Sequence, residues 1–400
     1  MLTLISLILA GMAALLSVPI AVLFVEVIAA LNAVVMKQFE ESSEASSSRV
    51  AVIVPAHNES TGVVPTIEDI KPQLGIDDRL IVVADNCSDD TAAVARASQA
   101  DVIERNDLTQ IGKGYALGWG INHLEVDPPD FVVFIDADCR IEPDMIGRLK
   151  QVCSKLQRPV QACFLMKTAD DSPIDHSLAE FAWILKNWVR PLGLRYLNCP
   201  VQLMGTGMIF PWEVIRSAPL ASGNLVEDLK LGLDLAAAGN APYFFPFVIG
   251  SSVFPISEKG TDSQRKRWVQ GHLHTIMTTL PRLLFLSISR RNLDLLVMTL
   301  DLAVPPLSLL GLLVVAMFAL SCVGWLVGLS SAVVVISAAN LLFFALSILL
   351  AWSKFARHVL SAGALLSIGA LVGTKIRLYV EVLLGRAATQ WIRTDRGKPK

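Results

Sequence analysis

Long apolar runs without charge mark both ends of the chain. Residues 1–36 carry one charged side chain, Glu26, and residues 302–353 carry none. Glu26 is expected to face protein or the interface, because a carboxylate in lipid is unfavourable. A helix that crosses a membrane needs about 20 apolar residues. We therefore expect one transmembrane helix over residues 1–36 and a transmembrane hairpin over residues 301–353, with its turn at residues 328–331. The first run is too long for the apolar part of a signal peptide, and no basic segment precedes it.

The segments that flank the apolar runs carry most of the nearby charge. Residues 281–300 interleave arginines with leucines, which predicts an amphipathic segment at the membrane interface. Residues 354–385 are expected to form a third C-terminal or interfacial helix, and residues 386–400 form a basic tail. Basic residues gather on the cytoplasmic side of membrane helices. The N-terminus is therefore expected outside, and the middle domain and the tail inside.

Between the apolar ends, the pattern changes to short strands that alternate with helices. After a linker over residues 37–49, continuous apolar runs typical of buried parallel strands lie at residues 50–54, 80–84 and 131–135. Helical patterns between them cover residues 61–73, 89–99 and 112–124. This alternation predicts an α/β fold with a doubly wound, mostly parallel sheet, in a cytoplasmic domain over residues 50–280. In such sheets, ligands bind outside the carboxyl ends of the strands.

The composition agrees with a membrane-bound protein that carries one globular domain. Of the 400 residues, 53% are hydrophobic and only 18% are charged, whereas about a quarter of residues are charged in soluble domains. The six cysteines form no C-x-x-C pair. This favours a reduced cytosolic domain, and no metal is assigned to them. The formal net charge of −2 identifies no partner, and nucleic acid is not expected as one.

Polar groups follow each of the three predicted strands. The sequence Pro-Ala-His-Asn-Glu at residues 55–59 follows the first, Asp85 ends the second, and Asp136 and Asp138 follow the third. Two carboxylates one residue apart attract a hard divalent cation, Mg²⁺ or Mn²⁺, which can bridge phosphates. The alternative is a pair of aspartates that cap the next helix. Asp85 suits the N–H groups of a nucleoside base, or else a helix cap or turn.

Two charged residues at predicted helix starts have chemistry suited to a phosphate or to an attacking hydroxyl. Lys113 lies between glycines at the start of a helix, which suits a phosphate, although the glycine spacing of a P-loop is missing. Asp228 opens an amphipathic helix that ends at Gly239. It is either a general base or a partner of the helix dipole, and the local sequence does not choose between them.

The segment Gln-Arg-Lys-Arg-Trp at residues 264–268 is dense in cations. Arg265 and Arg267 can clamp phosphates, and Trp268 can stack on a sugar or line an acceptor site. The alternative is a basic helix that lies against lipid headgroups. The histidines at positions 272 and 274 are expected to pack or to face solvent, and a contribution to the site is the alternative.

Taken together, these motifs resemble glycosyltransferase family 2, the membrane-bound inverting enzymes that include cellulose, chitin and hyaluronan synthases. That family has an aspartate, a D-x-D, a later aspartate and Q-(Q/R)-x-R-W, in this order. The matching positions here are Asp85, Asp136, Asp138, Asp228 and residues 264–268. The resemblance covers about residues 50–280 and the membrane-flanked layout. It implies a GT-A fold and a single displacement with inversion at the anomeric carbon.

The resemblance also implies a role for each matching residue. Asp228 would be the catalytic base, and Asp136 and Asp138 would hold Mg²⁺ or Mn²⁺. Donor contacts would come from Pro55, Glu59, Asp85, Lys113, Asp136, Gln264, Arg265 and Arg267. The acceptor side would be formed by Gly205, Thr206, Gly207 and Trp268.

The enzyme implied by these roles acts at the inner cell membrane. It moves a sugar from UDP-hexose or UDP-N-acetylhexosamine to a hydroxyl of a lipid-linked or growing polysaccharide acceptor. Membrane lipids are expected partners, and an export or channel partner is a further candidate, because three or four spans are few for a polymer channel. Two alternatives stay open: a polyprenyl-phosphate glycosyltransferase, and a non-catalytic membrane protein that binds nucleotide sugars.

Overall fold

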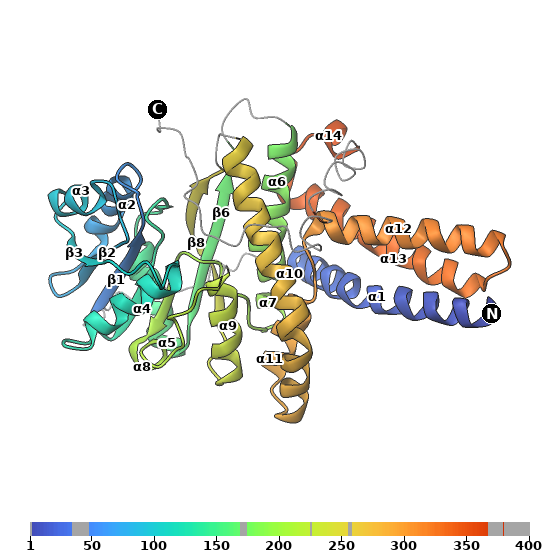
Figure 1. Cartoon of the computed structure of the whole chain (residues 1–400), viewed down its shortest axis with the longest axis horizontal. Coiled ribbons are helices and arrows are strands. Elements are labelled where there is room, and N and C mark those ends of the chain that lie inside the picture. Colours follow the sequence, from blue (N-terminus) through green and yellow to red (C-terminus); the bar gives the residue numbers. More distant parts are fainter. Residues whose placement is uncertain are drawn as a thin grey trace.

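The computed structural model describes residues 2–33, 48–168, 174–224, 226–254, 258–366 and 379. A sheet flanked by helices forms one end of the molecule, and long helices extend away from it (Figure 1). By length and composition, three of the described helices can cross a membrane: α1 (Leu2–Asn32), α12 (Leu307–Leu326) and α13 with its continuation (Ser331–Ala356). They coincide with the predicted spans, and their place in a membrane stays a prediction.

Four parallel strands form the half of the sheet that ends in the predicted site. Their order is β3 (Asp101–Arg105), β2 (Arg79–Asp85), β1 (Val50–Ala56) and β4 (Phe131–Phe134). The apolar runs thus correctly locate β1, β2 and β4, whose residues are almost all buried. The sequence does not predict β3, because three of its five residues are charged and it lies at the edge of the sheet.

The other half of the sheet mixes strand directions. β7 (Met208–Pro211) runs antiparallel to both β4 and β6 (Val160–Lys167), and β8 (Tyr243–Val253) runs parallel to β6. The short β5 (Arg140–Ile141) pairs antiparallel with β8. The predicted mostly parallel sheet therefore holds for one half, and the eight-stranded sheet as a whole is mixed.

The predicted helices lie between these strands, with ends that differ by a few residues. They are α2 (Val63–Ile70), α3 (Thr91–Ala97) and α4 (Lys113–Leu124), and a short 3₁₀ turn extends α2 to Gln73. The remaining described helices are α5 (Met145–Leu156), α6 (Ile174–Ile184), α7 (Arg190–Tyr196), α8 (Trp212–Ile215), α9 (Glu227–Ala237), α10 (Glu258–Ser289), α11 (Leu293–Leu302), α13 (Ser331–Ala351) and α14 (Ala362–Leu366).

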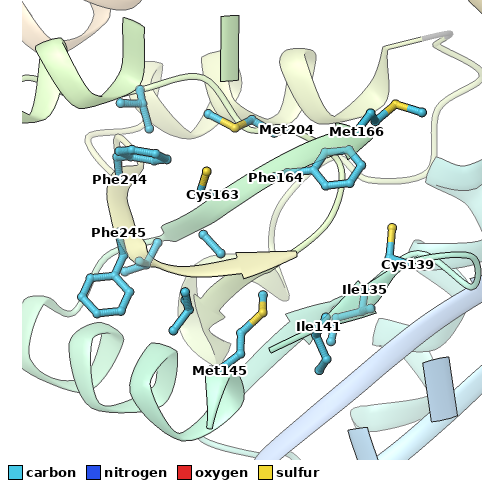
Figure 2. Close-up of a cluster of buried hydrophobic side chains, with 14 of the residues drawn as sticks. Ile135, Cys139, Ile141, Met145, Cys163, Phe164, Met166, Met204, Phe244 and Phe245 are labelled. Carbon is cyan, nitrogen blue, oxygen red and sulfur yellow. The ribbon is translucent and has the colours of Figure 1, made fainter. Parts of the chain in front are cut away.

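Alternate residues of the buried strands pack into two hydrophobic cores, one on each face of the sheet. In β1, Val52 and Val54 join one core, while Ala51 and Ile53 join the other. This is the side-chain alternation of a strand buried on both faces. Figure 2 shows part of the first core, which includes labelled apolar side chains of β6 and β8.

A buried ion-pair triad joins the sheet domain to the long helices. Arg190 at the start of α7 donates through Nε to Glu26 of α1 at 2.6 Å, and it also pairs with Asp301 of α11. Gly193 permits this approach, because a Cβ there would lie 2.0 Å from the carbonyl oxygen of Glu26. The expectation that Glu26 faces protein or the interface is therefore met by a protein contact.

Replacing Arg190 by Met should destabilise the protein strongly. The change leaves two buried carboxylates without their cation, which typically costs about 3–5 kcal/mol. The measurement is the thermal midpoint of the detergent-solubilised protein. Arg216→Met is the matched control, since Arg216 pairs with Glu213 on an exposed helix surface and should change stability by less than about 1 kcal/mol. Equal effects of the two variants would contradict the triad's structural role.

One predicted segment boundary falls inside a described helix. The globular domain was expected to end at residue 280. Helix α10 instead continues past this position to Ser289, with Pro281 inside the helix. Within the predicted interfacial segment 281–300, Phe285 and Leu293 are exposed. Of the predicted segment 354–385, the structure describes residues up to 366 and residue 379, and the basic tail 386–400 lies outside the described residues.

Candidate functional site

A large cavity of about 1140 Å³ opens at the carboxyl ends of β1, β2 and β4. It gathers most of the residues that the sequence singled out, from seven separate segments of the chain. Those that line it are Pro55, Glu59, Asp85, Lys113, Asp136, Asp138, Gly205, Asp228, Gln264, Arg267 and Trp268. The parallel half of the sheet explains this convergence, because its strands all end at the same edge.

The acidic pair after β4 has the donors of a cation site. Ligand atoms of Asp136, Asp138 and Cys139 lie within 4.8 Å of one another. Burial raises the pKa of the Cys139 thiol far above its ordinary value, so it stays protonated. The two half-buried carboxylates therefore remain as ligands, and such hard oxygen donors suit Mg²⁺ or Mn²⁺.

Lys113, the first residue of α4, lies at the centre of the charged groups. Its Nζ is 2.5 Å from Asp136 Oδ1, 2.7 Å from the carbonyl oxygen of Gly205 and 3.5 Å from Glu227 Oε1. Burial would lower its pKa, but the neighbouring carboxylates outweigh burial and raise it. Lys113 is therefore a permanent positive charge beside the acidic pair.

The loop at residues 205–207 brings the catalytic candidates together. A Cβ built on Gly205 would lie 3.2 Å from Asp228 Oδ2, 3.5 Å from Lys113 Nζ and 3.8 Å from Asp136 Oδ2. Gly205 and Gly207 have φ values of +91° and +66°. Thr206 is buried, and its Oγ1 accepts a hydrogen bond from the backbone N–H of Asp136 at 3.1 Å.

The three predicted acceptor-side residues of this loop thus have different positions. Gly205 lines the cavity, whereas Thr206 is buried and fixes the loop to the strand end. The N–H of Gly207 donates to the carbonyl of Phe134 on β4 at 2.9 Å. Of these three residues, Gly205 is the one that lines the cavity, while Thr206 and Gly207 hold the loop. Their acceptor-side roles stay a prediction.

Gly205→Ala should reduce turnover by roughly 10²-fold or more, since displacing groups at a reacting centre by about 1 Å has an effect of this size. The new methyl group would crowd Asp228 and Lys113, and the left-handed φ adds backbone strain. Steady-state kinetics of nucleotide-sugar turnover measures the loss. Gly147→Ala is the control, since nothing lies within 4 Å of a Cβ there, and activity that survives Gly205→Ala would contradict the close packing.

Two adjacent acids open α9 at the far side of this loop. Asp228 Oδ1 accepts a hydrogen bond from the N–H of Leu229 at 2.8 Å. Burial raises the pKa of Asp228, and the positive charge of Lys113 opposes the rise. Glu227 is also buried, which raises its pKa to about 7. Glu227 was not among the predicted site residues, although its position next to Asp228 in a first helical turn was a usable signal.

Asp85 ends β2 in a buried ion pair that the sequence did not reveal. Arg105, at the end of β3, donates to Asp85 Oδ1 at 2.7 Å, and both side chains are buried. Asn86 donates to the same oxygen at 3.2 Å. Burial raises the pKa of Asp85, while Arg105 lowers it. The pair fixes the orientation of the carboxylate at the wall of the cavity.

The cationic motif lies on α10, and helical spacing selects which members reach the cavity. Gln264, Arg267 and Trp268 stand at positions i, i+3 and i+4, which share one helix face. Burial lowers the pKa of Arg267, although Glu227 and Asp136 oppose this. The side chain of Arg265 lies outside the described residues, so its predicted role stays a prediction.

An aromatic cluster extends the acceptor side beyond Trp268. Its ring lies 4.8 Å from that of Trp183 on α6, and Trp183 donates to the carbonyl of Phe164 at 3.1 Å. His272, one helical turn after Trp268, also lines the cavity. Burial lowers its pKa to about 3, with Lys186 and Arg190 adding to the effect. His272 is therefore a neutral wall residue and not an acid or a base.

The mixed α/β sheet with an acidic strand edge has the architecture of a GT-A-type glycosyltransferase. The family model described as glycosyltransferase like family 2 matches residues 48–271, which is more than half of the chain, and the chain belongs to this family. The predicted family is therefore confirmed, and so is the enzyme class of metal-dependent glycosyltransferase. The assignment of the acidic pair as the cation site stays a prediction that the geometry allows.

Curated relatives include two glucosyl-3-phosphoglycerate synthases. The one from Mycolicibacterium smegmatis is 34% identical over 194 residues, which is 44% of this chain and 61% of that protein. The one from Mycobacterium tuberculosis is 39% identical over 215 residues, which is 48% of this chain and 64% of that protein. The chain thus spans less than two thirds of the length of these relatives.

A solved structure extends the likeness of the fold. Mannosyltransferase PcManGT from Pyrobaculum calidifontis, in complex with GDP-Man and Mn²⁺, is 17% identical and has a TM-score of 0.51. The match covers 86% of this chain and 99% of that chain. The likeness therefore concerns the fold.

Proposed function

We propose that this protein transfers a sugar from a nucleoside diphosphate donor to a hydroxyl of a membrane-associated acceptor, with inversion at the anomeric carbon. The observation that carries the proposal is the meeting of Lys113, Asp136 and Asp228 around Gly205. These three residues line one cavity, and we assign them as the phosphate-binding cation, the metal-binding acid and the base. UDP-hexose or UDP-N-acetylhexosamine is the proposed donor.

On the donor side, the chain's own groups would hold the nucleotide and balance its charge. Asp85, oriented by Arg105, would accept hydrogen bonds from the base. Lys113 and Arg267 supply positive charge near Asp136. Asp136 and Asp138 would hold Mg²⁺ or Mn²⁺, which when bound supplies positive charge to the departing diphosphate.

On the acceptor side, Asp228 would take the proton of the attacking hydroxyl. Its carboxylate is buried at the start of α9 and lies next to the glycine loop. The raised pKa makes it a stronger proton acceptor than a surface aspartate, which suits a general base. Trp268, packed on Trp183, would form the wall against which the acceptor rests.

A membrane location is part of the proposal. The three long apolar helices expose large hydrophobic side chains, among them Leu7, Leu15 and Leu326, which are 66%, 74% and 76% exposed. Exposed apolar surfaces of this extent mark membrane or protein contacts. We place these helices in the inner cell membrane and the sheet domain in the cytoplasm. A lipid-linked or polysaccharide acceptor fits this placement, with an export partner for a polymer.

The curated relatives favour a second candidate function. Their name describes synthesis of glucosyl-3-phosphoglycerate, so a small phosphorylated hydroxy acid is the alternative acceptor. The same donor groups and the same base would serve both reactions. The difference lies on the acceptor side of the cavity.

The experiment is a donor panel on the purified, detergent-solubilised protein with Mn²⁺. Calorimetry measures binding of UDP and GDP, and a coupled assay measures nucleoside diphosphate release from each nucleotide sugar. The proposal expects one donor to be turned over, with the release abolished by EDTA and restored by Mn²⁺.

Three results would count against the proposal. Nucleotide binding without turnover of any sugar, in the presence of a membrane lipid extract and 3-phosphoglycerate, indicates the non-catalytic alternative. Turnover that persists in EDTA contradicts the role of the acidic pair. Label that moves only to a polyprenyl phosphate supports the polyprenyl-phosphate alternative over a hydroxyl acceptor.

A further inference from the structure

The cavity does not end at the donor site. Beyond Trp268 it continues between α6, α12 and α13, where apolar side chains form its walls. Among these are Phe181, Leu307, Gly311, Phe344 and Ile348. Its volume of about 1140 Å³ exceeds the roughly 300–1,000 Å³ of ordinary small-molecule pockets. The inner part has room for an apolar chain in addition to a nucleotide sugar.

Charged side chains also line the cavity. Arg190 and Asp301 pair with each other, and Lys186 lies in the π-helical segment between α6 and α7 (Leu185–Val189). Its Nζ lies 5.8 Å from the centre of the Trp183 ring. Within the described part of the chain, the structure records no carboxylate within ion-pair distance of Lys186, in contrast to Lys113 and Arg190.

Lys186 lines the same cavity as Asp228, the proposed base. The negative charge that acts most strongly on it is that of Asp228, while burial lowers its pKa and Arg190 adds a like charge. A cation without an ion-pair partner in a partly enclosed cavity is unfavourable unless an anion joins it. An anion bound by Lys186 would lie between Asp228 and the apolar walls of the cavity.

We infer, on the basis of the proposed function, that the acceptor is an anionic lipid with a free hydroxyl: its charged group binds Lys186, and its apolar chain fills the space between α6, α12 and α13. The hydroxyl is then delivered to Asp228. Two of the helices that line the inner cavity, α12 and α13, are candidate membrane spans. A lipid could therefore enter from the membrane.

Three features define this acceptor class, and each of three related compounds lacks one of them. Phosphatidylglycerol has an apolar chain, an anionic phosphate and free hydroxyls. Diacylglycerol lacks the anion, polyprenyl phosphate lacks the separate hydroxyl, and 3-phosphoglycerate lacks the apolar chain. In transfer, the acceptor oxygen bonds to the anomeric carbon, the bond to the nucleoside diphosphate breaks, and the hydroxyl proton passes to Asp228.

The experiment gives these four acceptors to the full-length protein in mixed micelles, with labelled donor and Mn²⁺. Glycosylated phosphatidylglycerol, formed at a higher kcat/KM than product from the other three acceptors, is the expected result. Preference for 3-phosphoglycerate would show that the apolar chain of the acceptor is not needed. Equal use of diacylglycerol would show that its anionic group is not needed. Preference for polyprenyl phosphate would show that a hydroxyl separate from the phosphate is not needed, and each of these results overturns the inference. Donor turnover with none of the four glycosylated also overturns the inference.

Lys186 itself is tested by Lys186→Met and Lys186→Arg. A hydrogen bond to a charged group is worth about a ten- to hundredfold change in affinity, so Lys186→Met should raise the KM for phosphatidylglycerol by that factor. Its kcat should change much less, and Lys186→Arg should restore most of the affinity. Lys155→Met, on the exposed side of α5, is the control.

The outcomes separate this inference from the proposed function. An unchanged KM in a folded Lys186→Met variant overturns the role of Lys186. If Lys186→Met does not fold, the wild type decides: preference for phosphatidylglycerol over diacylglycerol supports the role of Lys186, and equal or better use of diacylglycerol overturns it. Absence of any donor turnover by the wild type would instead overturn the proposed function.

Discussion

Asp228→Asn is expected to lower kcat by about 10²–10⁴-fold, the usual contribution of a general base. The substitution keeps the size and the hydrogen bond from Leu229 to Oδ1, but the amide cannot accept a proton. Nucleoside diphosphate affinity should stay within a few-fold of wild type, because Asp228 faces the acceptor side of the glycine loop. Steady-state kinetics with calorimetry of UDP binding measures both quantities.

Asp234→Asn is the matched control for this prediction. Asp234 lies on the same helix, α9, where it pairs with Lys230 on the exposed side. Its loss should leave kcat unchanged, because i,i+4 pairs on a helix contribute only about 0.3–0.5 kcal/mol to stability. A near-normal rate in Asp228→Asn would shift the role of base to Glu227, whose carboxyl is also buried and near Lys113.

Asp138→Asn should weaken Mn²⁺ binding by on the order of 100-fold or more, since even outer partners of metal ligands contribute 10–100-fold. Turnover at limiting Mn²⁺ should fall in parallel and recover partly when the metal concentration is raised. Asp138 is a cleaner test than Asp136, because Asp136 also pairs with Lys113. Electron paramagnetic resonance titration of free Mn²⁺ measures the affinity.

Asp144→Asn serves as the control for the metal prediction. Asp144 is exposed before α5 and has a left-handed φ of +61°, a conformation that Asn also tolerates. Its Mn²⁺ affinity and turnover should match those of wild type. Unchanged Mn²⁺ affinity in Asp138→Asn would contradict the cation site at the end of β4.

The parallel half of the fold was predictable because its strands are continuous apolar runs. β1, β2 and β4 were located within two residues, and Gly239, with φ of +89°, ends α9 as predicted. Before α3, Asp89 Oδ1 accepts a hydrogen bond from the N–H of Thr91 at 3.0 Å, whereas the N-cap residue Asp90 makes no side-chain cap hydrogen bond.

The half of the sheet with mixed strand directions was not predictable from the same pattern. β8 contains Pro246 and Gly250, which interrupt both continuous and alternating apolar patterns. It pairs with β6 through an irregular register between Ala162 and Cys163. Such pairings depend on contacts between segments about 80 residues apart, and the local sequence does not specify them.

The residues of the candidate site also fall into two groups: those that the local sequence indicates and those that it does not. Asp85, Asp136, Asp138 and Asp228 were found because each follows a strand or opens a helix. Lys186, Trp183 and Arg105 carried no local signal, since their meaning depends on neighbours brought by other elements. Glu26 was expected to face protein, but its partner Arg190 lies 164 positions away.

The most direct test of the central claim is the fate of labelled sugar from the preferred donor, with Mn²⁺ and native membrane lipids. The account predicts label in the organic phase, formed by wild type and by Asp234→Asn, and reduced by about 10²–10⁴-fold in Asp228→Asn. Nuclear magnetic resonance of the product should show inverted anomeric configuration. Label only in small water-soluble phosphorylated product, or retained configuration, would contradict the account.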